Sequence, residues 1–345
     1  ESYFYDARIR TNPNHDVNKD IVIVTWDKKT SQSIGRKNGS KEEAPFCDWP
    51  CGFDHHLRLN KFLAESKVRA VGHFYELDDK LIANDSRSKE WIDFVSTQKD
   101  FWFVNRYDHS PDTANPVPQW MEKVNSMNRG TTWDRLSFAK DQVSRRSILF
   151  AMGELRLPVK LAEYLVGSPI NPENIRNAYQ SEMFDAYYIN INYAGDTREP
   201  QKTFPNYSVI DIIEGRVDPK VFNDKLVLVG RFDLQHRMDV AFTPFGSGNS
   251  ENSFLMVNAH IVNTIASNNA ISAPSNSLSF FLTLIIACLS AASVLILSPV
   301  FGLLSMIGIL VIFIVGSFLS FWYLYIWIPM ASVIIASIAT HYIII

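Results

Sequence analysis

The first 270 residues alternate short apolar runs with stretches of helical periodicity. The apolar runs are rich in β-branched and aromatic residues and predict buried strands at residues 20–27, 68–75, 101–105, 186–193 and 225–230. Helices are predicted between them, at residues 54–66, 88–98, 174–179, 208–214 and 258–267. Residues 107–146 are rich in Pro, Asn and Ser and predict mainly loop with short helices. This alternation indicates an α/β fold, a mixed sheet flanked by helices.

Polar residues mark the ends of several predicted elements. Asp54 and Ser208 stand where two helices begin, and a side-chain oxygen there can accept hydrogen bonds from free backbone N–H groups. Gly215 closes the second of these helices. Acids also follow strands, at Asp27, within residues 76–79, and at Asp233 and Asp239. Ligands bind beyond the carboxyl ends of strands in open α/β sheets, but acids at these positions are also ordinary caps.

The pattern changes completely after Glu251. From Asn252 to Ile345 the chain has no Asp, Glu, Lys or Arg, and three apolar runs follow one another at residues 278–297, 300–318 and 324–345. About 20 apolar residues suffice for a helix to cross a bilayer. A buried hairpin of a soluble protein is the alternative, but soluble helices keep a polar face, and these runs have none. We therefore predict a head at residues 1–271, a linker at 272–277 and an all-α bundle of three transmembrane helices at 278–345.

The predicted bundle has three further features. Tyr and Trp residues between the second and third runs are typical of the headgroup region, and they are Trp322, Tyr323, Tyr325 and Trp327. His341 is the one residue of the runs that can carry a charge near neutral pH, which indicates either a functional position or a site at the interface. Small residues that favour close helix packing predict a homodimer or higher oligomer within the lipid bilayer; they are Gly302, Gly308, Gly316, Ala287, Ser290, Ala291 and Ala292.

Composition narrows the function classes. The formal net charge is −3, with both signs interspersed over the head, so we expect no nucleic-acid partner. Of the three cysteines, Cys288 lies in the first apolar run, as a small apolar residue. Cys47 and Cys51 flank three residues and are candidates for a disulfide in an oxidising compartment. Free thiols and a metal site are the alternatives, although no second pair of ligands lies nearby.

Catalytic motifs are missing from the sequence. It has no GxGxxG or P-loop phosphate cradle, no GxSxG elbow and no HExxH zinc helix. His55 and His56 are adjacent, so on a helix they diverge by about 100°, and we expect one to face the core and the other water. An enzymatic role for the head therefore has no support, and we expect no catalytic residue, no metal site and no cofactor.

Several landmarks nevertheless occur in a characteristic order. Residues 1–8 (ESYFYDAR) precede the strand IVIVTWD, and Trp49-Pro50 comes before an amphipathic helix. Asn190-Ile-Asn192-Tyr193, the strand KLVLVG, Thr243-Pro244 and Asn258-Ala259-His260 follow, and then the apolar runs. In this order the chain resembles the type-two CHASE domain, an extracytoplasmic sensory module of bacterial receptors. The similarity covers nearly the whole chain.

The resemblance implies a head outside the cytoplasmic membrane and three spans that lead to a cytoplasmic output domain, a nucleotide cyclase or a kinase. It also implies a further span before residue 1, and the absence of an initiator Met and the unflanked apolar end lead us to expect sequence beyond both ends. Two departures from the family pattern stand out. Gly72-His73-Phe74-Tyr75 lacks the usual acid, and Cys51-Gly52-Phe53-Asp54 replaces the usual arginine after Trp-Pro.

These observations favour a sensory input module in the inner membrane, with its head periplasmic or extracellular. It would respond to an unidentified ligand or protein. We expect the ligand-proximal residues to be Asp27, Trp49, Asp239 and His260, and signal transfer to pass through residues 273–277. A structural subunit of an envelope complex is the alternative, and a membrane-anchored hydrolase would need a nucleophile–base pair that the sequence does not reveal. The short connections lack Lys and Arg, so the positive-inside rule leaves orientation to the resemblance.

Overall fold

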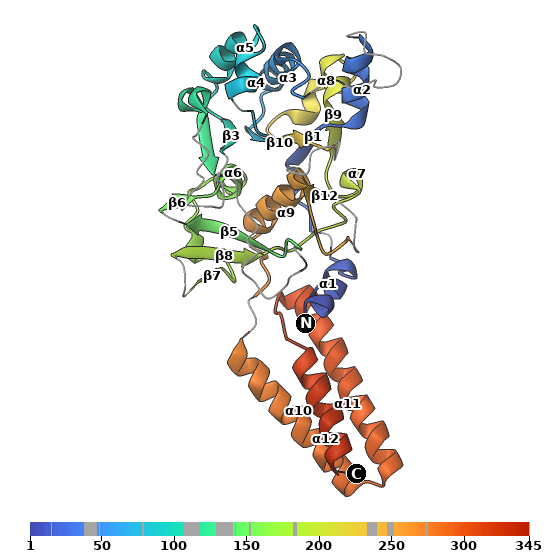
Figure 1. The fold of residues 1–345 in the computed structure, drawn as a ribbon. Helices are drawn as coiled ribbons and strands as arrows, with labels where there is room; N and C mark the ends of the chain where they lie inside the picture. The colour runs from blue at the N-terminus through green and yellow to red at the C-terminus, as the bar shows by residue number, and fades with distance from the viewer. Residues whose placement is uncertain are drawn as a thin grey trace.

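The computed structural model has two parts, an α/β head and a helical bundle that projects from it (Figure 1). The structure describes residues 1–14, 16–37, 47, 49–77, 79–105, 118–128, 141, 143–151, 153–181, 185–232, 240–246, 252–272 and 275–344. The two ends of the described chain lie at opposite ends of the bundle. Residue 1 lies where the head meets the helices, and the last described residues lie at the far end of the bundle (Figure 1).

A parallel sheet of six strands forms the centre of the head, in the order β4-β3-β2-β10-β1-β9. In that order its strands are Asn125–Asn128, Phe101–Asn105, Ala70–Phe74, Leu226–Arg231, Ile21–Trp26 and Asn206–Ser208. All residues of β1, β2 and β10 are buried. Continuous β-branched runs are expected here, because helices cover both faces of a parallel sheet.

The two faces of the sheet contribute to two separate cores. Val22 and Val24 of β1 point to a core that contains helices α3 (Phe53–Glu65), α5 (Ser88–Val95) and α8 (Val209–Ile213). Ile21 and Ile23 point to the opposite core, which contains α6 (Leu157–Val166) and α9 (Phe254–Ala266). Successive side chains of one strand point to opposite faces of the sheet, so β1 contributes to both cores.

Helix α9 is buried along almost its whole length, unlike an amphipathic surface helix. Gly230 of β10 makes its close approach to the sheet possible, because a Cβ there would lie 2.9 Å from the Cβ of Leu255. Ser253 caps the helix, and its hydroxyl accepts a hydrogen bond from Leu255 N at 3.2 Å. The predicted helix at 258–267 is confirmed, but the cap places its start at Phe254.

A second sheet is antiparallel, with the order β6-β5-β8-β7. Its strands are Glu154–Leu155, Arg146–Ala151, Ala186–Asn190 and Tyr179–Gln180. The remaining elements are α1 (Ser2–Arg10), α2 (Lys28–Lys37), α4 (Asp79–Ala83), η1 (Gln119–Lys123), η3 (Pro172–Asn174), α7 (Pro200–Thr203), η4 (Pro219–Phe222), β11 (Val240–Ala241) and β12 (Asn252–Ser253).

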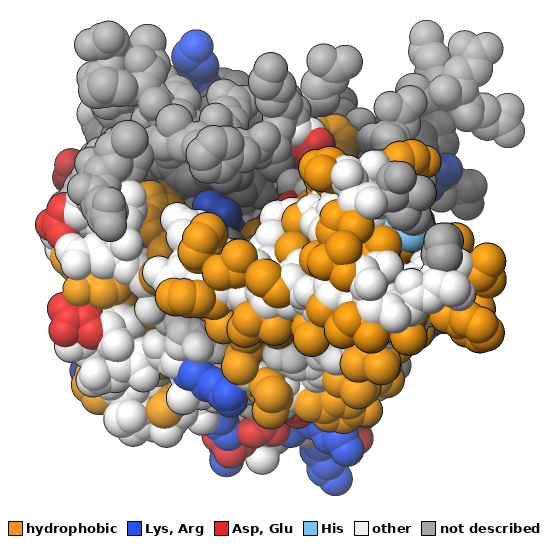
Figure 2. Space-filling model, turned by 90° about the horizontal axis from the view of Figure 1, so that it is seen from below, with side chains coloured by type: hydrophobic (Ala, Val, Ile, Leu, Met, Phe, Trp, Pro, Cys, Tyr) orange, Lys and Arg blue, Asp and Glu red, His pale blue; other side chains and the backbone are white. Residues whose placement is uncertain are grey.

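The bundle contains α10 (Asn276–Ile296), α11 (Pro299–Leu319), a π-helical turn (Ser320–Leu324) and α12 (Ala331–Ile344). Two helical stretches, Asn276–Ile296 and Val300–Leu324, are long and apolar enough to cross a membrane. Hydrophobic side chains cover the bundle when it is viewed from its far end (Figure 2). Helix α10 leads away from the head, α11 returns to it, and α12 leads away again (Figure 1).

The third helix differs from the prediction for residues 324–345. It begins at Ala331, and its 14 residues are too few to qualify by length as a span. Tyr325 has φ +59°, in the left-handed region, and this conformation ends the preceding helical turn. Phe321 and Trp327 are buried in the core of the head, so the aromatic link is part of a protein interface.

Several local predictions were wrong. The helix predicted at 174–179 is a single 3₁₀ turn followed by β7, and Asn177 there has φ +59°. Asp54 and Ser208 make no capping hydrogen bond to their helices. Gly215 does close α8, with φ +73°. Of the adjacent histidines, His56 is fully buried and His55 is partly exposed, as predicted.

Candidate functional site

The carboxyl ends of three central strands lie next to one another. Strand β1 ends at Trp26, β2 at Phe74 and β10 at Arg231, and these strands pair in register as direct neighbours. This is the edge of an open α/β sheet at which ligands bind. Two of the predicted residues, Asp27 and Trp49, lie at this edge.

Trp49 is the half-buried centre of an aromatic cluster. Its ring centroid lies 5.7 Å from that of Trp26 and 5.4 Å from that of Tyr75, both edge-on. The guanidinium carbon of Arg231 lies 4.5 Å from the centroid of Trp49, within the range of a cation–π contact. The indole Nε1 donates to the carbonyl of Glu76 at 3.4 Å. The indole is thereby held against the ends of all three strands.

The segment that carries Trp49 is fixed on both sides. Cys47 and Cys51 form a disulfide, and the intervening Trp49-Pro50 peptide bond is cis. The ring of His56 lies under this segment and stacks on Trp26, with 4.3 Å between centroids. Its Nε2 lies 2.9 Å from the Pro50 carbonyl oxygen, and its Nδ1 lies 3.2 Å from the Tyr75 hydroxyl.

Burial sets the protonation state of this cluster. His56 is fully buried, which lowers its pKa to about 3 despite the opposing hydrogen bond to the Pro50 carbonyl. Burial also raises the pKa of Tyr75 above its usual range. Both side chains are therefore neutral at neutral pH. Because Nε2 faces a carbonyl oxygen, it carries the imidazole proton, and Nδ1 accepts from the Tyr75 hydroxyl.

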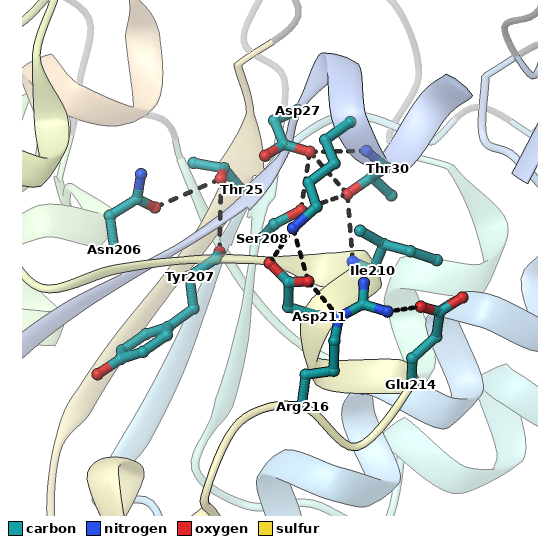
Figure 3. Close-up of polar contacts among 11 residues, drawn as sticks. Thr25, Asp27, Thr30, Asn206, Tyr207, Ser208, Ile210, Asp211, Glu214 and Arg216 are labelled. Carbon is teal, nitrogen blue, oxygen red and sulfur yellow. Dashed lines mark hydrogen bonds and ion pairs between the residues drawn. The ribbon is translucent and has the colours of Figure 1, made fainter. Parts of the chain in front are cut away.

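Asp27 lies in a polar network between the end of β1 and the start of α8 (Figure 3). Its Oδ1 accepts from the backbone N–H and the hydroxyl of Thr30, both at 2.8 Å, and from the Ser208 hydroxyl at 2.9 Å. Thr30 is the third residue of α2, so Asp27 caps that helix. The network also explains why Ser208 does not cap α8.

The predicted residue His260 does not join this edge. His260 is fully buried on α9, across the sheet from Trp49. Its Nδ1 accepts from Ala194 N at 3.2 Å, its ring lies against Tyr193 and Phe204, and burial lowers its pKa to about 3. Asp239, like Asp233, lies outside the described residues. Of the three predicted residues that the structure describes, Asp27 and Trp49 lie at the same edge of the sheet and His260 does not.

Sequence reasoning missed Arg231 and the supporting pair of His56 and Tyr75. Arg231 directly follows the predicted strand at 225–230 and is the last residue of β10 in the structure. A basic residue directly after a buried strand is the signal that could have identified it. Among the residues that the structure describes, no group of three or more His, Cys, Asp or Glu side chains could hold a metal ion.

Comparison with known proteins gives one match. A family model described as the CHASE2 domain matches residues 1–297, which is most of the chain. No curated protein and no solved structure matches it. The matched region runs from the first residue of the head through the first apolar helix. The family match therefore includes both the head and α10.

Proposed function

The chain belongs to the CHASE2 domain family, and on that premise we propose that it is the input module of a bacterial transmembrane receptor. CHASE2 domains are extracytoplasmic sensory domains of receptors. The observation that carries the proposal is the match over residues 1–297, which includes an apolar helix of membrane-spanning length. In this proposal the head lies outside the inner membrane, and the helices lead to a cytoplasmic output domain of the cyclase or kinase type.

We propose that α12 is the third crossing. It runs in the direction opposite to α11, beside α10, and carries no charged residue except the titratable His341 (Figure 1). Fourteen residues rise about 21 Å, which is short of the roughly 30 Å hydrocarbon core. The proposal therefore needs either a thinned bilayer around α12 or a continuation of the helix past Ile344. Reporter fusions distinguish two crossings from three.

The test uses fusions of alkaline phosphatase and green fluorescent protein at four positions in a bacterial host. Phosphatase is active only outside the inner membrane. We expect active phosphatase after Ser272 and Leu324, and fluorescence after Leu297 and Ile344. Fusions at Leu297 and Leu324 are internal controls for the two long helices. Active phosphatase after Ile344 would remove the third crossing, and fluorescence after Ser272 would place the head inside the cell and refute the proposal.

The ligand-proximal assignment also stays a proposal, now centred on the sheet edge. Trp49 and Asp27 support it by position, and Arg231 joins them through its contact with the indole. Trp49→Ala should change the output activity of the full-length receptor, while Trp102→Ala should not. Trp102 is a matched control because it is also half-buried but lies in the opposite core. Equal behaviour of the two variants would contradict the assignment.

A homodimer through the helices is proposed on similar grounds. Gly302 is already used inside the hairpin, where its Cβ position lies 3.1 Å from the Val294 Cα, and Ser290 is fully buried. Gly308 and Gly316 of α11 have nothing within 4 Å of their Cβ positions among the described residues. They leave a surface that a helix of a second copy can approach closely.

A further inference from the structure

Two connections join the head to the bundle. One is the covalent passage from α9 into α10, predicted above as the path of the signal. The other is a set of contacts with the segment Ser320–Ala331, here called the α11–α12 link. Glu1 and α1 make many of these contacts. Further hydrogen bonds to the link come from Asn14, Arg176, Asn177 and Ser272. In the described residues, hydrogen bonds of α10 stay within the bundle. The α11–α12 link, in contrast, is bound to the head at many points.

The carboxylate of Glu1 caps α12. Its Oε2 accepts from Met330 N at 2.9 Å and from Ala331 N at 3.1 Å, and its Oε1 accepts from Trp327 Nε1 at 3.0 Å. The first N–H groups of a helix lack partners within it, and a carboxylate there also interacts favourably with the helix dipole. The side chain of Glu1, the residue directly before α1, thus supplies the N-terminal cap of a helix that begins 330 residues later.

Arg8 is the second anchor and is fully buried. Its Nη2 donates to the Ile328 carbonyl at 2.8 Å, and its Nη1 lies 3.8 Å from Glu1 Oε1. The guanidinium lies over the rings of Phe318 and Phe321, at 5.8 and 5.6 Å from their centroids. Burial lowers its pKa to about 10, against the opposing effect of Glu1. A buried cation is costly unless it is paired, so this geometry is strongly specified.

Tyr5 and Trp322 complete the contact. The ring of Tyr5 packs edge-on against Phe321 and Trp327, with centroids 5.3 and 4.8 Å away. The indole Nε1 of Trp322 donates to the Arg8 carbonyl at 2.9 Å. One face of α1 therefore holds the α11–α12 link through a cap, a buried charge and an aromatic cluster.

The other side of α1 is fixed to the second sheet. Asp6 binds Arg145 through two hydrogen bonds of 2.7 Å, Nε to Oδ1 and Nη2 to Oδ2. The carboxylates of Asp6 and Asp141 outweigh the effect of burial on Arg145 and raise its pKa above the usual range. Arg145 directly precedes β5. Helix α1 thus contacts Arg145, next to the second sheet, on one side and the α11–α12 link on the other.

We propose that α1 transmits the state of the head to α12, with Glu1, Arg8 and Asp6 as the positioning residues. A shift of the second sheet against the bundle moves Asp6, and the rigid helix carries Glu1 and Arg8 with it. Loss or displacement of the cap then changes how α12 begins. This inference rests on the proposed function, since a transmitted state has a use only in a receptor.

The experiment measures hydrogen exchange of the Met330 and Ala331 amides by mass spectrometry, with the full chain in lipid nanodiscs. Glu1→Gln should speed their exchange about tenfold, the effect of losing a cap. Asp6→Asn should speed it several-fold, although Asp6 makes no hydrogen bond to the α11–α12 link within the described part of the chain. The two effects should not add in the double variant.

Asp20→Asn is the matched control, because Asp20 also binds a basic side chain, Lys225 at 2.6 Å, and among the described residues this pair makes no hydrogen bond or ion pair to α1 or to the α11–α12 link. It should leave the two amides unchanged. If Glu1→Gln leaves Arg8 without a counter-charge and prevents folding, Glu1→Gln with Arg8→Met removes both charges together. Unchanged exchange in the Asp6 variant, with faster exchange in the Glu1 variant, would reduce the contact to a local cap and overturn the inference. Unchanged exchange in both would mean that the contact does not form in lipid.

These outcomes are independent of the reporter fusions. A cytoplasmic head would refute the receptor proposal. The exchange results would then still show that α1 couples the head to α12, but not that this coupling serves a receptor. A periplasmic head with unaffected amides would refute only the route through α1.

Discussion

The imidazole of His56 stacks on the indole of Trp26 at 4.3 Å between centroids, with an angle of 26° between the rings. This contact places a titratable group inside the core, directly below the sheet edge that carries Trp49. His73 and His260 are fully buried as well, and burial lowers the pKa of all three to about 3. Each must stay neutral for the head to remain folded.

The head should therefore lose stability in acid. Each histidine is neutral in both states above its unfolded pKa of about 6.5, and below that value only the unfolded state binds the proton. The free energy of unfolding should fall as pH drops from about 6.5 to 3, by about 1.4 kcal/mol per pH unit for each histidine. Urea unfolding at a series of pH values measures the slope. His260→Gln should reduce this slope by about one third.

The two acids that bind Arg145 should differ in importance. Asp6 is 14% exposed and Asp141 is 44% exposed, at similar distances from the guanidinium. Asp6→Ala should lower the free energy of unfolding by about 3 kcal/mol, because it leaves a largely buried cation less well paired. Asp141→Ala should lower it by less than about 1 kcal/mol, since water screens an exposed pair. Equal losses in urea unfolding would contradict this reading of the site.

Gly230 should not tolerate a methyl group. Its Cβ would lie 2.9 to 3.1 Å from three carbon atoms of Leu255, so α9 would have to move away from β10. We expect Gly230→Ala to lower the free energy of unfolding by about 1–3 kcal/mol. Adding Leu255→Ala should recover part of this loss through the space it creates. A double variant that is less stable than the sum of the two single changes would rule out the steric explanation.

Reduction of the Cys47–Cys51 disulfide should lower the stability of the head and make Trp49 more accessible to solvent. The Cys47–Cys51 bridge closes a loop of about five residues, for which chain entropy predicts a stabilisation of about 2 kcal/mol. Dithiothreitol should lower the melting temperature of the wild-type protein and increase the acrylamide quenching of its tryptophan fluorescence. The same treatment of a Cys47→Ser, Cys51→Ser variant is the control and should change neither quantity.

The glycines of α11 should affect association rather than folding. Gly308→Leu and Gly316→Leu place bulk where the described chain has open space, so they should weaken a dimer about tenfold or more without unfolding the bundle. Mass photometry in nanodiscs measures the dimer fraction. Gly302→Leu, inside the hairpin, should instead disrupt the bundle itself. If none of the three changes alters the dimer fraction, the dimer interface lies elsewhere.

Sequence patterns predicted four of the six strands of the central sheet, β1, β2, β3 and β10, and missed β4 and β9. The runs around Ile21, Phe101 and Leu226 are apolar and mostly buried, and their predicted bounds agree with the structure to within a residue or two. The second sheet was largely missed: of its strands, only the run at Ala186 was predicted. Strand β5 begins at the end of a stretch, residues 107–146, whose composition indicates loop.

The remaining errors come from contacts between residues distant in sequence. Asn177 takes a left-handed conformation and donates to the Ala270 carbonyl at 2.7 Å, and no local pattern predicts this bond. The late start of α12 likewise depends on the carboxylate of Glu1. The edge of the site could be predicted from strand ends, but His260 was assigned to it because the order of motifs does not tell which side of the sheet a helix covers.

The pairing of β1 with β10 has a consequence for biogenesis. Ile21 lies beside Leu226, so two neighbouring strands of the sheet are separated by about 200 residues of polypeptide. Non-local pairing of this kind is slow and leaves strand edges open to aggregation until it is complete. During export, the first strand must wait until most of the head has emerged. A receptor of this architecture should thus depend on holding chaperones while it is being secreted, more than a domain whose neighbouring strands are consecutive.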